Sequence, residues 1–162
     1  MQTPTEEEQR RRWRWQWLTA IGAFANAEVQ RDRWTDPNER NPYFSFVECM
    51  CSYFDDALMS DEGAFERRMK AGHLSSEEAA VTVEFHAAAG AYGPPHDDDW
   101  AIKAILADPA WQKVVALAQE AQCRLLPLLS DQGDRAALTE PLEWREEAGI
   151  FSPVLNDIAY VR

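Results

Sequence analysis

The chain has 162 residues, of which 46% are hydrophobic, and its formal net charge is −12. This length and composition favour a single folded domain with a buried core and exclude an acidic disordered chain. Up to Arg40, seven arginines balance seven acidic residues, whereas the rest of the chain has nine basic and 21 acidic residues. The acidic body argues against nucleic acid and anionic membranes as ligands and favours a basic partner, because surface charge of one sign selects its opposite.

The N-terminal segment MQTPTEEEQRRR does not resemble a secretory signal, because its acidic residues come first and no apolar core follows at once. No run approaches the roughly 18 apolar residues of a membrane span. Three cysteines, an odd number, do not form a disulfide framework and favour a reducing compartment. Together these features predict a cytoplasmic protein with no membrane partner.

An amphipathic helix is predicted at the N-terminus, within residues 1–33. Thr5 can cap it, and three glutamates follow in the first turn, where the helix dipole favours negative charge. Helical spacing places four large apolar residues on one face: Trp13, Trp17, Ile21 and Phe24. We expect this face to pack against the rest of the domain.

Further helices are predicted after a loop at 34–42, where prolines and asparagines interrupt any period. A capping box at Ser75 and Glu78 starts an alanine-rich helix, and Asp108 followed by proline starts the clearest amphipathic one. The predicted helical segments are 42–59, the stretch from Ser60 to Gly72, 76–92, 98–107 and 109–126.

The chain is therefore predicted to be an all-α single domain, a bundle of about six to eight helices. The helix within residues 1–33 should pack on a core formed by 43–130. Residues 131–162 are less regular and are predicted to be an irregular tail, although Thr139 could start a short helix that ends at Gly149. The final IAYVR is compatible with either a strand or an ordered tail.

The segment QRRRWRWQW (9–17) resembles an aromatic and basic patch for nucleic acid. However, Glu6, Glu7 and Glu8 each precede an arginine by four residues, the favourable order for a helical ion pair. The tryptophans fall largely on the buried stripe, where arginine stems pack well over indole rings. We therefore predict a packing role for this segment and no nucleic-acid binding.

Histidines and cysteines raise the possibility of a metal or acid–base site. Cys49 and Cys51 point to nearly opposite sides of a helix, so they cannot share one ion. His86 shares a stripe with apolar residues, and His96 precedes three aspartates that can cap the next helix. No catalytic residue, metal ligand or cofactor is assigned, but an enzyme that uses His86, His96 and nearby aspartates remains an alternative.

Acidic clusters beside aromatic residues are the strongest candidates for a binding surface. Carboxylates pair with lysine and arginine and accelerate association, and aromatic residues anchor protein interfaces. The predicted partner-binding residues are Asp55, Asp56, Asp61, Glu62, Asp97, Asp98, Asp99, Tyr53 and Trp100.

The middle half of the chain resembles small helical immunity proteins of contact-dependent growth inhibition and other polymorphic toxin systems. The segments that carry the resemblance are SYFDD (52–56), the serine and glutamates before FHAAAGAY, PPHDDDW (94–100) and LADPAW (106–111). The resemblance implies a bacterial, cytoplasmic, non-enzymatic inhibitor that binds one cognate toxin domain. It does not define the binding surface.

The sequence leads to one hypothesis and two alternatives. In the leading hypothesis the chain is an immunity protein that neutralises a bacterial toxin, a basic nuclease, through its acidic surface. The alternatives are a metal-dependent or acid–base enzyme, and an acidic secretion chaperone or adaptor for a basic effector.

Overall fold

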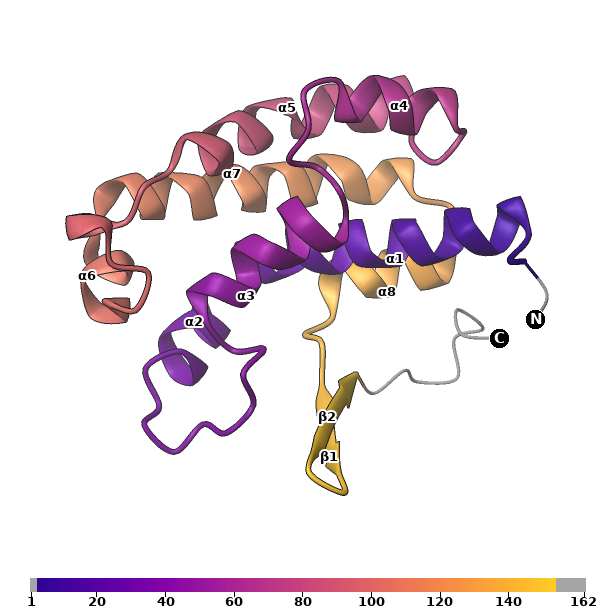
Figure 1. Cartoon of the computed structure of the whole chain (residues 1–162). Helices are drawn as coiled ribbons and strands as arrows, with labels where there is room; N and C mark the ends of the chain where they lie inside the picture. The colour runs from indigo at the N-terminus through magenta and orange to yellow at the C-terminus, as the bar shows by residue number, and fades with distance from the viewer. Residues whose placement is uncertain (1–2, 154–162) are drawn as a thin grey trace.

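The computed structural model describes residues 3–153 and confirms an all-α single domain (Figure 1). The α-helices among these residues are α1 (Glu6–Ala25), α2 (Ala27–Arg33), α3 (Phe46–Cys51), α4 (Ala64–Lys70), α5 (Ser76–Ala91), α6 (Ile102–Ala107), α7 (Pro109–Leu125) and α8 (Gln132–Thr139). The remaining elements are a π-helical turn η1 (Ser52–Asp56), the 3-10 turns η2 (Pro95–Asp97) and η3 (Leu126–Leu128), and the strands β1 (Trp144–Glu147) and β2 (Ile150–Pro153). No helix of the described residues is both long enough and apolar enough to cross a membrane.

The first helix is shorter than predicted, because Asn26 divides the N-terminal segment into α1 and α2. The side chain of Asn26 accepts a hydrogen bond from the backbone N–H of Val29 and so caps α2. At the other end of α1, Thr5 and Glu8 form a capping box. Of the three predicted Glu–Arg pairs, the one between Glu7 and Arg11 forms, at 3.0 Å.

The predicted apolar stripe of α1 lies at the centre of the core. Its four large residues are each at most 5% exposed, and α1 packs against both α7 and α8. Figure 1 shows α5 and α7 side by side, with α1 running along α7 and α8 beside α1. The ring of Phe24 contacts those of Tyr53, Phe85 and Trp111, with centroids 5.0–6.0 Å apart. Buried aromatic rings from four segments therefore join these helices into one core.

The backbones of α1 and α8 approach closely at Gly22. A Cβ atom at this position would lie only 2.8 Å from the carbonyl oxygen of Leu138. Glycine is required here because a backbone atom cannot move aside as a flexible side chain can.

The predicted helix at 42–59 divides into α3 and the π-helical turn η1. Ser45 caps α3 through its hydroxyl, which accepts a hydrogen bond from the N–H of Glu48. In η1 the N–H of Ala57 donates to the carbonyl of Ser52, five residues earlier. Leu58 then adopts a left-handed backbone with φ of 56° and ends the segment. A π-turn inserts one extra residue per turn, and such turns are frequent at functional sites.

The cap signals of α5 and α7 predicted their starts correctly. Ser75 and Glu78 form the expected capping box, and Asp108 accepts a hydrogen bond from Ala110 before the proline at the first helical position. The predicted segment from Ser60 ends as expected at Gly72, whose left-handed backbone, with φ of 73°, follows α4.

The C-terminal segment is more regular than predicted. Residues 132–139 form α8, which packs on α1, and Thr139 ends this helix where the sequence suggested the start of another. Strands β1 and β2 then form an antiparallel hairpin, closed by the left-handed residues Ala148 and Gly149. The predicted alternatives for IAYVR lie outside the described residues.

Candidate functional site: an acidic and aromatic surface

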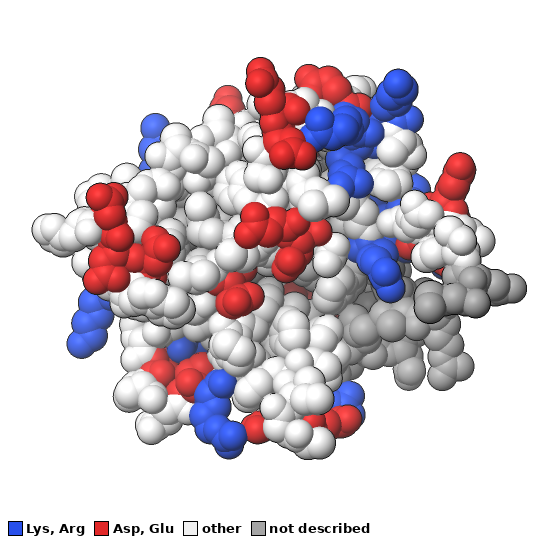
Figure 2. All heavy atoms as spheres, in the orientation of Figure 1, with Lys and Arg blue, Asp and Glu red and all other residues white. Residues whose placement is uncertain are grey.

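The predicted acidic residues are all exposed but occupy different parts of the domain. Asp55 and Asp56 end η1, and Asp61 and Glu62 lie just before α4. Asp97 to Asp99 belong to the connection between α5 and α6, which Figure 1 shows at the α6 end of the domain. Figure 2 shows acidic side chains in separate groups on this face, one of them over α3 and η1 with uncharged surface beside it.

Most of these carboxylates have no basic partner in the part of the chain that the structure describes. Asp61 forms an ion pair with Arg67 at 3.2 Å, and Arg67 also donates to the backbone carbonyl of Glu62. Within residues 3–153, no ion pair involves the side chains of Asp55, Asp56, Glu62 or Asp97 to Asp99. Apart from Asp61, the predicted set therefore leaves its negative charge unneutralised at the surface.

Tyr53 is a correction to the predicted site, because its side chain is fully buried. Its ring packs edge-on against Phe24 and Phe85, and its hydroxyl lies 3.0 Å from Nδ1 of His86. Burial strongly raises the pKa of Tyr53. The adjacent aspartates point to solvent while Tyr53 faces the core, so it cannot contact a partner at this surface.

Trp100 remains a candidate anchor, because 71% of its side chain is exposed. The connection that presents it is strained: His96 and Asp97 both have left-handed backbones, with φ of 59° and 52°. The expected helix capping by the three aspartates is wrong. The first residue of α6 is Ile102, and its N-terminal cap, Ala101, offers no side-chain bond. Asp98 instead accepts a hydrogen bond from the N–H of Trp100 at 2.9 Å, which shapes the loop.

The two histidines of the enzyme alternative have different environments. His86 bonds Tyr53 and contacts the rings of Phe54 and Phe65, and burial lowers its pKa. His96 is exposed on the α5–α6 connection. In the part of the chain that the structure describes, no group of three or more His, Cys, Asp or Glu side chains could hold a metal ion.

A cavity of about 150 Å³ lies beside the acidic end of α3 and η1, between these elements, α1 and the C-terminal hairpin. Aromatic rings and carboxylates line it together: Trp15, Tyr43, Trp144, Glu48 and Asp56. The rings of Tyr43 and Trp144 lie 4.6 Å apart. Such a lining suits a cation that has an aliphatic stem.

Burial and nearby carboxylates raise the pKa of two residues at or beside this cavity. The pKa of Tyr43 is raised, first by burial and also by the negative charges of Glu48 and Asp56. The pKa of Cys51 is raised to about 11, by burial and by its hydrogen bond to Asp55. Deprotonation of either residue would add negative charge beside existing carboxylates. The negative potential of these carboxylates favours a positively charged ligand.

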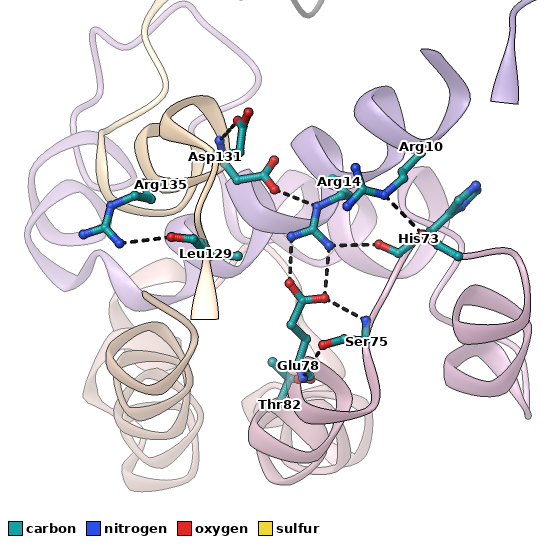
Figure 3. Close-up of polar contacts among 11 residues, drawn as sticks. Arg10, Arg14, His73, Ser75, Glu78, Thr82, Leu129, Asp131 and Arg135 are labelled. Atoms are coloured by element: carbon teal, nitrogen blue, oxygen red, sulfur yellow. Dashed lines mark hydrogen bonds and ion pairs between the residues drawn. The ribbon is translucent and has the colours of Figure 1, made fainter. Parts of the chain in front are cut away.

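Sequence reasoning missed the hairpin that closes this cavity and also missed a buried charge cluster on the other side of α1 (Figure 3). Arg14 is only 4% exposed and donates hydrogen bonds to Glu78 at 2.7 and 3.0 Å and to Asp134 at 2.7 Å. It also donates to the carbonyl of His73 at 2.9 Å. One signal was present, because Arg14 precedes Trp17 and Leu18 by three and four residues, which is buried-stripe spacing.

No family model matches this chain, and searches of curated proteins and of solved structures also find no match.

Proposed function

We propose that this chain is an immunity protein that binds a cognate bacterial toxin domain, a basic nuclease, and neutralises it through an acidic surface. The observation that carries the proposal is the exposed connection between α5 and α6. There Trp100 is 71% exposed beside Asp97, Asp98 and Asp99, and no ion pair within residues 3–153 neutralises these aspartates.

This arrangement costs free energy that burial elsewhere must offset. Two consecutive left-handed residues, His96 and Asp97, cost on the order of 1 kcal/mol each. Like charges kept together repel one another, and an exposed indole keeps a large apolar surface in water. Tryptophan is among the residues most often responsible for binding energy at protein interfaces. A surface maintained at such a cost supports a role in recognition.

A nuclease fits the chemistry of this surface. A protein that binds a polyanionic substrate carries lysine and arginine at its substrate groove. Exposed carboxylates can occupy that groove by pairing with the same side chains, and opposite charge accelerates the encounter. The resemblance of SYFDD, PPHDDDW and LADPAW to immunity proteins supports the same role.

The first experiment identifies the partner and tests its toxicity. The tagged chain is purified from its native cell, bound proteins are identified by mass spectrometry, and each is then expressed alone and with this chain. We expect a basic protein that degrades nucleic acid and stops growth alone, and whose toxicity co-expression removes. A harmless secreted partner would favour the chaperone alternative. Stoichiometric metal together with turnover by the purified chain would favour the enzyme. Either result contradicts the proposal.

The second experiment locates the surface with matched variants. Trp100→Ala should weaken partner binding about tenfold or more, since a central aromatic anchor contributes about 1–2 kcal/mol or more. Ile150→Ala removes a similarly exposed apolar side chain and should leave binding unchanged.

Charge reversal tests the carboxylates. Replacement of Asp97, Asp98 and Asp99 by lysine, or of Asp55 and Asp56, should slow association with the partner, and the effect should be stronger at low salt. The control for the pair at 55 and 56 is Glu84→Lys with Glu120→Lys, which changes the net charge equally at exposed sites on α5 and α7. If reversal at all five aspartates leaves binding and protection unchanged, the surface assignment is wrong.

A further inference from the structure

The cavity beside Glu48 and Asp56 adjoins a second, larger cavity. The second has a volume of about 340 Å³ and lies around the junction of α1 and α2, closed by α7 and the residues after α8. Thr19, Tyr43 and Leu142 line both cavities. The two cavities therefore lie next to each other along α1, and together we call them the α1 groove.

The charged residues that line the α1 groove are all acidic. Glu48 and Asp56 lie at one end, and Glu28 and Glu140 line the other cavity. Among residues 3–153, no lysine or arginine lines either cavity. Arg33 and Arg40, which flank the nearby loop, pair with Glu39 and Glu146. Arg33 also lies over the ring of Phe44, 4.0 Å from its centroid, but its guanidinium is paired with Glu39. Each cavity thus presents carboxylates that form no ion pair within residues 3–153, which favours a ligand with two separated cations.

Aromatic rings line the groove between its acidic ends. Trp15, Tyr43 and Trp144 surround the smaller cavity, and Trp34 and Phe44 line the larger one. Lysine and arginine stems pack on such rings, and their cations are attracted to the ring faces. The indole Nε1 of Trp144 is enclosed and has no hydrogen-bond partner among residues 3–153.

Glutamine side chains give the larger cavity hydrogen-bond acceptors. Gln119 donates its amide N–H to the carbonyl of Ala25, and Gln122 donates to that of Leu138, at 3.0 and 2.8 Å. These bonds satisfy carbonyls at the ends of α1 and α8 and fix the orientation of both amides. The Oε1 atom of each glutamine accepts no hydrogen bond within the described chain and can receive one from a peptide N–H or a guanidinium group.

The length of the groove defines the size of its occupant. Its lining on α1 runs from Trp15 to Asn26, which is about 16 Å along a helix. An extended chain covers this distance with about five residues. The π-turn η1 supplies Ser52 and Asp56 to the same lining, so the one irregular turn of this segment lies at the groove.

From these observations we infer that the α1 groove binds an extended segment of about five residues of the partner protein, with a lysine or arginine near each end. This inference rests on the proposed function and specifies how the partner is held. Glu48 and Asp56 pair with one cation, Glu28 and Glu140 with the other, and the aromatic rings contact the stems between them.

The test uses a defined peptide, acetyl-Arg-Ala-Leu-Ala-Arg-amide, whose arginines are about 13 Å apart when extended. Its control is the same peptide with citrulline in place of both arginines, which keeps the shape and removes the charge. Binding to the full chain is followed by NMR through the indole N–H signals of the seven tryptophans. We expect the arginine peptide to shift the signals of Trp15 and Trp144 and to leave that of Trp100 unchanged. The citrulline peptide should bind about tenfold more weakly.

Two pairs of variants assign the site. Glu48→Gln with Asp56→Asn should lower the affinity for the arginine peptide about tenfold. Glu84→Gln with Glu120→Gln removes the same charge elsewhere and should not change its affinity. Equal binding of the two peptides, or shifts confined to Trp100, would overturn the inference. If the indole signals of Trp15 and Trp144 change with protein concentration alone, the occupant of the groove is a second copy of the chain. If they change when residues 154–162 are removed, the occupant is the chain's own C-terminal segment. Either result also overturns the inference.

The two proposals can fail separately. A captured partner without toxicity contradicts the proposed function but does not alter the peptide result. Equal binding of both peptides contradicts the inference about the groove, although protection against the toxin would persist.

Discussion

Carboxylates on the two sides of α1 have opposite environments. On one side, Glu78 and Asp134 are 6% exposed and both accept hydrogen bonds from Arg14. On the other, Glu48 and Asp56 line an open cavity that no lysine or arginine of the described residues lines. The comparison indicates that the net charge of −12 combines two kinds of acidic residue. One kind is neutralised internally and holds helices together, and the other leaves a field at the surface.

The buried cluster connects three helices that are distant in sequence. Arg14 lies on α1, Glu78 caps α5, and Asp134 lies in the first turn of α8. Burial alone would raise the pKa of Glu78, but hydrogen bonds from Arg14 and Ser75 outweigh it and lower the pKa. Burial opposes the charge of Arg14, yet its two carboxylate partners raise its pKa. Arg14 and Glu78 therefore both remain charged in the folded protein at neutral pH.

Removal of Arg14 should have the largest effect on stability. Arg14→Met leaves two buried carboxylates without their cation, and the loss of one member of a buried ion pair typically costs about 3–5 kcal/mol. The measurement is the free energy of unfolding in urea. Arg11→Met is the matched control, because Arg11 forms an exposed pair with Glu7 that contributes at most about 0.5 kcal/mol.

If Arg14→Met does not fold, Glu78→Gln provides a milder test, since the amide can still accept one hydrogen bond from Arg14. Equal stability of the Arg14 and Arg11 variants would show that the cluster does not hold the helices together.

The sequence predicted the helical class because local signals and burial agree in this chain. The stripe from Trp13 to Phe24, the capping box at Ser75 and the cap at Asp108 each specify a local structure that the packing preserves. The break at Asn26 and the π-turn at Ser52 were missed. Each interrupts an otherwise continuous helix locally, and the packing of neighbouring segments, rather than the local sequence, determines where the interruption occurs.

The candidate site was less predictable than the fold. Exposure of Asp55 follows from residue type, and Trp100 was a candidate because three aspartates precede it, but the α1 groove requires a hairpin whose pairing the sequence did not signal. Tyr53 was misassigned because adjacency in sequence to two aspartates does not fix which face of a turn a side chain occupies. The partners of Arg14 are 64 and 120 residues away, which no local pattern can encode.

A third kind of titratable group, one that the fold keeps neutral, should make stability depend on pH in the acid range. Burial lowers the pKa of His86 below the value of 6.5 that it has when exposed. Below about pH 6.5 the unfolded chain therefore binds a proton that the folded chain does not, and stability falls as the pH decreases. The slope approaches 1.4 kcal/mol per pH unit for this residue until the folded pKa is reached.

The groups that contact His86 are the hydroxyl of Tyr53 and the rings of Phe54 and Phe65, and none of them is charged. His73 also has a lowered pKa, through burial and nearby arginines, so it contributes a slope of its own. In urea unfolding at pH 5 to 8, the free energy of unfolding should therefore depend less steeply on pH for His86→Gln than for the native protein. Parallel curves for the two proteins would mean that His86 is protonated in the fold.

Neutralising the carboxylates Glu48 and Asp56 should have the smallest effect on stability. The sign of that stability change distinguishes the two sides of α1. Glu48→Gln with Asp56→Asn removes repulsion between Glu48, Asp55 and Asp56, but it also removes a favourable charge from the first turn of α3. These terms oppose each other, so the free energy of unfolding should change by less than about 0.5 kcal/mol at physiological salt. At about 20 mM salt, where repulsion is less screened, the variant should be the more stable protein.

Urea unfolding at both salt concentrations measures this change in stability. A loss above about 1 kcal/mol would mean that these carboxylates stabilise the fold as Glu78 does, and the distinction between a structural and a binding side of α1 would then fail.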